Sequence, residues 1–276
     1  VRENRTLNSM VPLWQRPKKE LKDEDYDQFY RATFYDAEAP VAHLHISAEG
    51  TVSYQALLYI PSHAAMDYYT KDYRRGLQLY SSGVMIMDCC PDLLPEHFQF
   101  VRGVVDSQDL SLNISREMLQ HDRQLTLIAG NLEKKIKQEL SRLQEQDREK
   151  YEKFYDAFGL QLKYGVVANF GQHKELLQDL LLFWSGKLEK MVTLKEYVEA
   201  MGAEQKYIYY AAGESRSRVA KLPQTELVLS KGCDVLYFTD EVDEFDAQII
   251  GTYLEKEFRS VLASDLELPG EAAQTP

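Results

Sequence analysis

Arg116 is the residue best placed for chemistry, because it stands in the first turn of a predicted helix beside a polar loop. The segment Asp109–Gln120 reads Asp-Leu-Ser-Leu-Asn-Ile-Ser-Arg-Glu-Met-Leu-Gln, so Ser115 can cap the helix and Gln120 follows Arg116 by one turn. Cations normally avoid a helix N-terminus, which already carries partial positive charge. A guanidinium there acts with the free N–H groups to attract an anion. The segment predicts an anion site, with a purely structural arginine as the open alternative.

A second candidate for an anion site is Gly213-Glu214-Ser215, which follows a predicted strand and opens a helix. An ordinary turn is the favoured interpretation. If the turn is functional, the chain is a free-standing α/β phosphotransferase-like enzyme. That alternative predicts a deep pocket at the C-terminal ends of strands 206–212 and 233–239.

Metal and redox sites receive little support. His43 and His45 point to one face of a strand, but no third ligand stands at a telling spacing, so an exposed or cross-strand pair is favoured. Adjacent Cys89 and Cys90 are interpreted as buried thiols rather than a redox switch. The acidic stretch 240–246 lacks the pattern of a calcium loop and is interpreted as a solvated face. We expect no metal site.

Composition narrows the class of protein further. The 276 residues suit two domains, and the net charge of −12 argues against a nucleic-acid partner. The sequence lacks both a run long enough to span a bilayer and a GxxxxGK[ST] or GxGxxG phosphate loop. Three cysteines without a disulfide or CxxC spacing favour a reducing, cytoplasmic compartment. Because the chain starts with Val1, without a Met or a leader pattern, we expect a piece of a longer protein.

Periodicity predicts a mixed α/β fold. Alternating runs at 41–48 and 52–60 indicate a hairpin, and apolar runs at 77–87 and 98–105 extend it to a sheet of about four strands. From Ser115 the period becomes 3.6, which predicts one long amphipathic helix with Gly130 as a possible kink or close contact.

The second half is predicted to form a separate, smaller unit. A helical connector covers 147–181, and Thr193-Leu-Lys-Glu196 has the spacing of a capping box. Strands at 206–212 and 233–239 flank helical pieces at 214–222 and 225–231, which predicts a parallel βαβ unit. The expected domains are 1–146, the connector 147–181, a smaller domain 182–262 and a flexible tail 263–276.

The segment Phe100–Gln120 resembles the middle segment of the ninety-kilodalton heat-shock chaperones of the bacterial HtpG type. The resemblance extends over nearly the whole chain. Further matching segments are Pro12-Leu-Trp14, Tyr59-Ile-Pro61, Leu77-Gln-Leu-Tyr80, Thr193-Leu-Lys-Glu-Tyr197, Ile208-Tyr-Tyr210, Gly213-Glu-Ser215 and Gly232-Cys-Asp-Val-Leu-Tyr-Phe-Thr-Asp240.

The resemblance implies a larger α/β/α layered domain, a helical connector and a smaller α/β/α domain. It implies that ATP, with Mg, is bound mainly by an N-terminal domain that precedes this segment, and that a C-terminal dimerisation domain follows it. Arg116 matches the family arginine that reaches the ATP γ-phosphate, Gln120 the glutamine that supports it, and Asn113 lies in the same catalytic loop. Ser111 replaces a common proline of that loop. We expect no cofactor on the fragment and no ATP hydrolysis by it alone.

The resemblance also implies binding of unfolded client proteins. Trp14 matches an exposed family tryptophan that contacts clients, although a lid over the sheet is an equal alternative. Met85 stands where the family has a client-contacting residue, usually Phe. Ser81-Ser82-Gly83 replaces basic residues of many members, which puts an acidic partner at that edge in doubt. A passive spacer that only joins two functional domains is the third interpretation.

Overall fold

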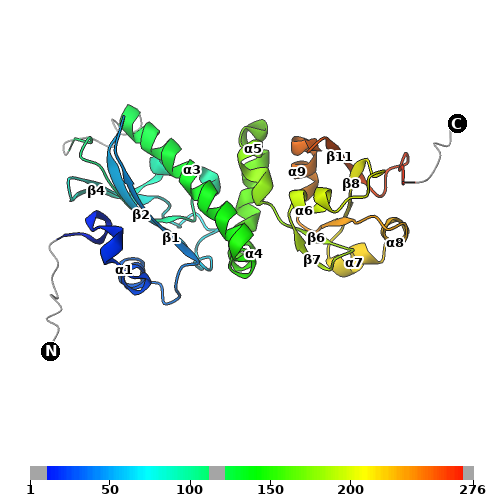
Figure 1. Ribbon diagram of the computed structural model, residues 1–276, viewed down its shortest axis with the longest axis horizontal. Helices are drawn as coiled ribbons and strands as arrows, with labels where there is room; N and C mark the ends of the chain where they lie inside the picture. Colours follow the sequence, from blue (N-terminus) through cyan, green and yellow to red (C-terminus); the bar gives the residue numbers. More distant parts are fainter. Residues whose placement is uncertain (1–10, 112–121, 270–276) are drawn as a thin grey trace. The chain divides into compact units, whose positions relative to one another are not determined.

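The structure is a computed structural model that describes residues 11–111 and 122–269. The chain separates into two compact units, Val1–Ala157 and Phe158–Pro276 (Figure 1). The division falls inside helix α4 (Arg148–Val167), within the range predicted as a connector. The predicted boundaries at 146 and 181 stay predictions.

A five-stranded sheet of order β1-β2-β5-β3-β4 forms the centre of the first unit. Its strands are β1 (Ala42–Ala48), β2 (Tyr54–Ile60), β3 (Leu77–Ser81), β4 (Val84–Cys90) and β5 (Arg102–Asp106). The predicted hairpin of β1 and β2 is confirmed, with His45 opposite Leu57. Neighbouring strands are antiparallel except for β3 and β5, which are parallel.

The run 77–87, predicted as a single strand, is two strands joined by a tight turn. Ser82 and Gly83 form the turn with φ values of 49° and 79°. Two successive positive φ values are typical of a type I′ hairpin turn, whose twist matches that of the strands. The sheet therefore has five strands, one more than the sequence predicts. The local sequence hides the turn because Ser-Gly is a weaker turn signal than Asn-Gly.

Helices cover this sheet on both sides. Helix α1 (Asp23–Phe34) buries Tyr26 and Tyr30 against Leu57 and Tyr59 of β2. Figure 1 shows α3 (Arg123–Gln146) on the side of β1 and β2 away from α1. Short 3-10 turns complete the unit: η1 (Leu13–Gln15), η2 (Lys18–Glu20), η3 (Pro91–Leu93) and η4 (Glu96–Phe98).

Helix α3 confirms the apolar period of the sequence. Every predicted core position within it is buried: Leu125, Ile128, Leu132, Ile136, Leu140 and Leu143. The helix runs unbroken through Gly130, where an added Cβ would meet nothing within 4 Å. Neither a kink nor a close contact therefore explains this glycine. The first part of the predicted helix, 115–121, lies outside the described residues.

The second unit carries a six-stranded sheet of order β10-β11-β8-β9-β6-β7. Its strands are β6 (Phe183–Ser185), β7 (Lys190–Val192), β8 (Tyr207–Ala212), β9 (Leu236–Phe238), β10 (Thr252–Tyr253) and β11 (Lys256–Ser260). Its other elements are η5 (Ala168–Gly171), α5 (Lys174–Leu177), η6 (Gln178–Leu180), α6 (Leu194–Glu199), α7 (Arg216–Ala220), α8 (Pro223–Ser230) and α9 (Asp243–Ile250).

Two sequence predictions are confirmed in this unit. Strands β8 and β9 are parallel with α7 and α8 between them, which is the βαβ unit. Thr193 and Glu196 form the capping box at the start of α6.

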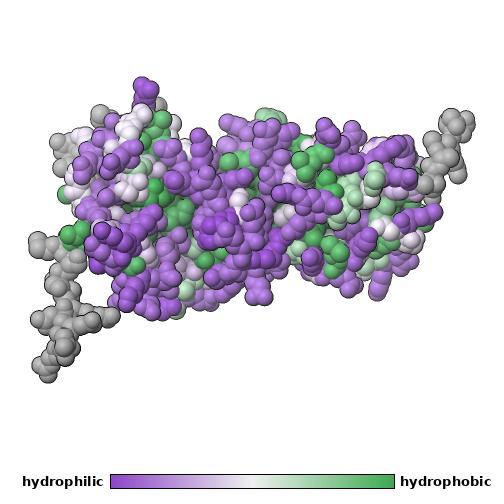
Figure 2. All heavy atoms as spheres, in the orientation of Figure 1, coloured by the Kyte–Doolittle hydropathy of each residue, from purple (hydrophilic) through white to green (hydrophobic). Residues whose placement is uncertain are grey.

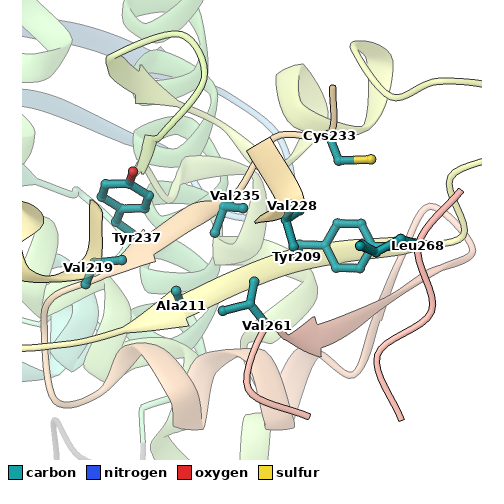
Figure 3. Close-up of a cluster of buried hydrophobic side chains, with 9 residues drawn as sticks. All are labelled: Tyr209, Ala211, Val219, Val228, Cys233, Val235, Tyr237, Val261 and Leu268. Atoms are coloured by element: carbon teal, nitrogen blue, oxygen red, sulfur yellow. The ribbon is translucent and has the colours of Figure 1, made fainter. Parts of the chain in front are cut away.

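The described part of the predicted flexible tail is packed. Tyr209, Val235 and Val261 belong to a buried apolar cluster that also includes Leu268 (Figure 3). The Tyr209 hydroxyl donates a hydrogen bond to the Glu267 carbonyl at 2.5 Å. Residues beyond the predicted boundary at 262 thus contact the core through Glu267 and Leu268, and the boundary itself stays a prediction.

The visible face of the molecule is mainly hydrophilic, with small hydrophobic spots (Figure 2). None of the described helices combines the length and the apolar run that a bilayer crossing needs.

Candidate functional site at the ends of the loop before α3

The three residues predicted to act on ATP, Asn113, Arg116 and Gln120, lie outside the described residues. The structure does describe the two ends of the segment that carries them. One end leaves β5 through Ser107–Ser111, and the other enters α3 at Asp122. How firmly these ends are held determines where a side chain between them can be presented.

The first end is fixed to neighbouring strands by hydrogen bonds. Ser107 donates its hydroxyl to the Ser53 carbonyl at 2.7 Å, and the Ser53 N–H donates to Asp109 at 2.7 Å. The Ser81 hydroxyl donates to the Leu110 carbonyl at 2.6 Å, and Leu110 is buried. The chain is thus anchored on both the β1–β2 and the β3–β4 side of β5.

The second end is a helix cap. The Asp122 carboxylate accepts the Leu125 N–H at 2.9 Å, and its negative charge faces the positive end of the helix dipole. Such a cap contributes about 1 kcal/mol to helix stability. The helix start is therefore stabilised locally at Asp122.

Asp106, at the end of β5, is a buried carboxylate that sequence reasoning missed. Its oxygens accept hydrogen bonds from Trp14 Nε1 at 3.0 Å, Gln15 Nε2 at 2.9 Å and the Gly83 N–H at 3.1 Å. Hydrogen bonds to a charged acceptor are roughly twice as strong as neutral ones. The carboxylate therefore joins the first described segment, the tight turn and the start of the loop. The sequence shows a polar residue at the end of a predicted strand, but it does not indicate the donors that bind the Asp106 carboxylate.

Trp14 is buried rather than exposed, and its role in client binding stays a prediction. Its side chain is 7% exposed and packs beside Phe29 and Tyr80, with ring centroids 6.1 and 4.9 Å away. Of the two interpretations left open, the structure favours a lid over the sheet. The physical reason is Asp106, which offers the indole N–H a buried acceptor 92 residues later in the chain.

A polar cavity of about 300 Å³ lies beside Asp106. Its lining includes Gln15, Glu49, Ser53 and Gln108 together with Asp106, and no lysine or arginine belongs to its described lining. Two carboxylates disfavour a phosphate there. The described part of the site holds no cradle for a nucleotide by itself.

Met85, which matches the family client-contacting position, is exposed, and its role in client binding stays a prediction. It lies near the start of β4, the edge strand of the sheet, and is 45% exposed beside the exposed Val84. The Ser82–Gly83 turn presents these two apolar side chains at the rim. Their arrangement gives a small apolar surface next to an open strand edge.

The histidine pair is structural. The Tyr26 hydroxyl contacts His45 Nδ1 at 2.8 Å, His45 Nε2 contacts the Trp14 carbonyl at 3.0 Å, and the His43 ring stacks on Tyr26 at 4.0 Å. Burial lowers the pKa of His45, with the backbone carbonyl of Trp14 opposing the shift. Both ring nitrogens of His45 are therefore already used within the fold.

The adjacent cysteines differ from each other. Cys90 is buried, and burial raises the pKa of its thiol to about 11, which makes it unreactive near neutral pH. Cys89 is only half-buried and donates to the Arg75 carbonyl at 2.7 Å. The buried-thiol interpretation holds for Cys90 and is wrong for Cys89.

The rival anion site at Gly213–Ser215 has the expected pocket but the wrong charge. A cavity of about 530 Å³ lies at the C-terminal ends of β8 and β9. Four carboxylates line it: Glu214, Asp240, Glu241 and Glu244. The helix that follows has five residues, and an added Cβ on Gly213 would come within 2.8 Å of Val219, so close packing accounts for the glycine. An anionic substrate is not supported.

The stretch 240–246 is only in part the solvated face that the sequence predicts: its acidic residues are exposed except for Asp243 and Asp246. Asp243 and Asp246 on α9 are 1% and 0% exposed, and Lys163 of α4 is 5% exposed. The Lys163 ammonium lies 2.6 Å from Asp243 and 2.7 Å from Asp240. Burial, reinforced by the charge of Asp243, raises the pKa of Asp246 to about 8. The one signal of this cluster in the sequence is Lys163, a lysine among apolar residues of a helix, and it lies 77 residues before Asp240.

Comparison with known proteins identifies the family. A model described as Hsp90 protein matches residues 1–275. The chain belongs to the Hsp90 family. It is 58% identical to the protein named Chaperone protein HtpG of Clostridium botulinum strain 657 over 270 residues, which cover 98% of this chain and 43% of that protein. It is also 58% identical to the HtpG of Oceanobacillus iheyensis, over 96% of this chain and 43% of that protein.

A solved structure gives the same assignment. The fold is similar to the middle domain of a Plasmodium falciparum putative heat shock protein, with a TM-score of 0.80 and 30% identity. The match covers 91% of this chain and all of that one. The chain thus spans less than half the length of the curated Hsp90 relatives and corresponds to a middle domain with layered α/β units, as the resemblance implied.

Proposed function

We propose that this chain is the middle segment of an ATP-dependent molecular chaperone, and that Arg116 reaches the γ-phosphate of ATP held by a preceding N-terminal domain. The family match over residues 1–275 carries the proposal. The anchored loop ends support it, because Ser107–Leu110 and the Asp122 cap hold both ends of the segment that contains Arg116. Gln120 supports the guanidinium, and Asn113 belongs to the same loop.

The chemistry suits an arginine that arrives from another domain. A planar, permanently charged guanidinium neutralises charge on the transferring phosphoryl group only when the two domains close. ATP, with Mg, stays bound mainly by the N-terminal domain, which agrees with a described loop-end cavity that offers carboxylates rather than cations. A C-terminal dimerisation domain and a cytoplasmic location belong to the same proposal.

The test is ATP hydrolysis by the full-length protein. Arg116→Ala is expected to lower the turnover rate by on the order of 100-fold, because it removes one transition-state contact. Nucleotide affinity and melting temperature should change little. Arg74→Ala, which removes an exposed arginine of the first unit, is the matched control. A loss of melting temperature without a selective loss of turnover would show that Arg116 is structural, and Arg116-dependent turnover by this chain alone would contradict the division between domains.

Client binding forms the second part of the proposal. Val84 and Met85 give an exposed apolar contact at a strand edge, whereas Trp14 is a lid and would have to leave Asp106 to meet a client. A photo-crosslinking residue at position 85 should capture a reduced, unfolded model protein. The control position is Met66, which is fully exposed in a loop. Equal capture at both positions would favour the passive spacer.

A further inference from the structure

The chain leaves strand β5 beside Ser53, the residue that precedes β2. The last pair of residues in the ladder between these two strands is Gln55 and Asp106, so Ser53 lies beyond it. Side chains bind both main-chain groups of Ser53. Its carbonyl accepts the Ser107 hydroxyl at 2.7 Å, and its N–H donates to the Asp109 carboxylate at 2.7 Å. Two side chains of the departing segment thus continue the contact where the backbone ladder stops.

Ser107 and Asp109 also bind each other, which closes a set of three contacts. The Ser107 hydroxyl, which donates to Ser53, accepts the Asp109 N–H at 3.3 Å. On the other flank of β5, the Ser81 hydroxyl donates to the Leu110 carbonyl at 2.6 Å. The start of the loop is therefore held to both neighbouring strands, and contacts on two sides set the direction in which it departs.

Asp109 is the member of this set that serves direction rather than packing. Ser107 and Leu110 are 1% and 3% exposed, whereas the Asp109 side chain is exposed and fills no space in the core. Its carboxylate is a charged acceptor, which makes its hydrogen bond to a backbone N–H roughly twice as strong as a neutral one. Because that bond lies at the surface, water can solvate the Ser53 N–H if the carboxylate is removed. Removal should loosen the loop without opening a cavity.

We propose that Asp109 is a positioning residue for Arg116: its bond to the Ser53 N–H fixes the direction in which the loop leaves the sheet, and thereby how often the guanidinium is in place for the γ-phosphate. The inference rests on the function proposed above and adds a residue to it. Arg116 follows Asp109 by seven residues. A misplacement of about 1 Å at a reacting group can lower a rate on the order of 100-fold. Since Asp109 acts through Arg116, its loss should lower turnover and leave the affinity for ATP unchanged.

The test is ATP hydrolysis by the full-length protein, with kcat and KM measured separately. Asp109→Ala should lower kcat about tenfold at constant KM and constant melting temperature. Asp109→Asn keeps an oxygen that accepts the Ser53 N–H, so it should retain most of the activity. Asp25→Ala is the matched control, because it removes an α1 carboxylate that accepts the Lys22 N–H at 2.9 Å, and it should turn over ATP as the unchanged protein does.

A double variant tests whether Asp109 acts through the arginine. Asp109→Ala combined with Arg116→Ala should be no slower than Arg116→Ala alone. An Asn variant as slow as the Ala variant, a rise in KM in place of the fall in kcat, or an additive loss in the double variant would each overturn the inference.

The same measurements separate the inference from the proposed function. If Arg116→Ala slows turnover and Asp109→Ala does not, the inference fails and the proposed function stands. If Arg116→Ala leaves turnover unchanged, the proposed function fails and the inference fails with it.

Discussion

Each unit contains a buried aspartate, and the two differ in whether hydrogen-bond donors surround the carboxylate. Asp106 in the first unit accepts hydrogen bonds from Trp14, Gln15 and Gly83. Asp246 in the second unit has no hydrogen-bond partner for either oxygen among the described residues, and its pKa is raised to about 8. Donors stabilise the charged form, whereas burial without donors favours the neutral form. A buried carboxylate is thus a hydrogen-bonded anchor in one place and a proton-binding group in the other.

The largest expected effect of a substitution comes from removing the cation of the second unit. Lys163→Met should lower the free energy of unfolding at pH 8 by about 3–5 kcal/mol, because Asp243 then stays buried without its counter-charge. Chemical unfolding of the chain measures it. Adding Asp243→Asn should restore part of the loss, since an apolar and neutral pair replaces the ion pair. A double variant as unstable as the single one would show that packing, not charge, explains the effect.

Removing Asp106, the hydrogen-bonded anchor of the first unit, should cost somewhat less. Asp106→Ala leaves the buried Trp14 indole N–H and the Gly83 N–H without acceptors, so we expect a loss of about 2–3 kcal/mol. Asp88→Ala, at an exposed aspartate of β4, is the control. Equal stability of the two variants would contradict the anchoring role.

The protonation of Asp246 predicts a pH dependence of the second unit. Because its pKa is raised above the ordinary value of 3.8 to about 8, the folded state binds the proton more tightly than the unfolded state. Stability should therefore fall as pH rises from about 4 to about 8, by up to about 1.4 kcal/mol per pH unit, and then level off.

Asp246→Asn removes that titration and should flatten the slope in denaturation curves recorded across pH 4–9. Lys163, Asp240 and Asp243 surround the group and stay unchanged. A slope that survives the substitution would assign the pH dependence to another group.

The smallest expected effect comes from Trp14→Phe, which tests the hydrogen bond of the indole apart from the packing of its ring. Trp14→Phe keeps an aromatic ring beside Phe29 and Tyr80 but removes one of the donors to Asp106. We expect a loss of about 1 kcal/mol, the usual net value of one such bond. In the Asp106→Ala background the same substitution should cost less, and an undiminished cost would show that lost ring packing dominates.

Local patterns predicted the elements of the fold far better than the contacts between distant elements. The β1–β2 hairpin, the apolar face of α3, the Thr193 capping box and the βαβ unit all followed from spacing within short windows. The burial of Trp14 did not, because its acceptor is 92 residues away. Asp243 looked solvated for the same reason, since Lys163 lies 80 residues before it. The sequence motif named Arg116, Gln120 and Asn113, and their roles stay predictions.

Asp106 also has a mechanical consequence. Trp14 and Gln15, close to the first described residue, both hold the carboxylate at the end of β5, from which the loop toward α3 departs. The Trp14 carbonyl also contacts His45 Nε2 of β1 at 3.0 Å. The entrance of the unit, its edge strand and the departure point of the loop are therefore tied together through two neighbouring side chains.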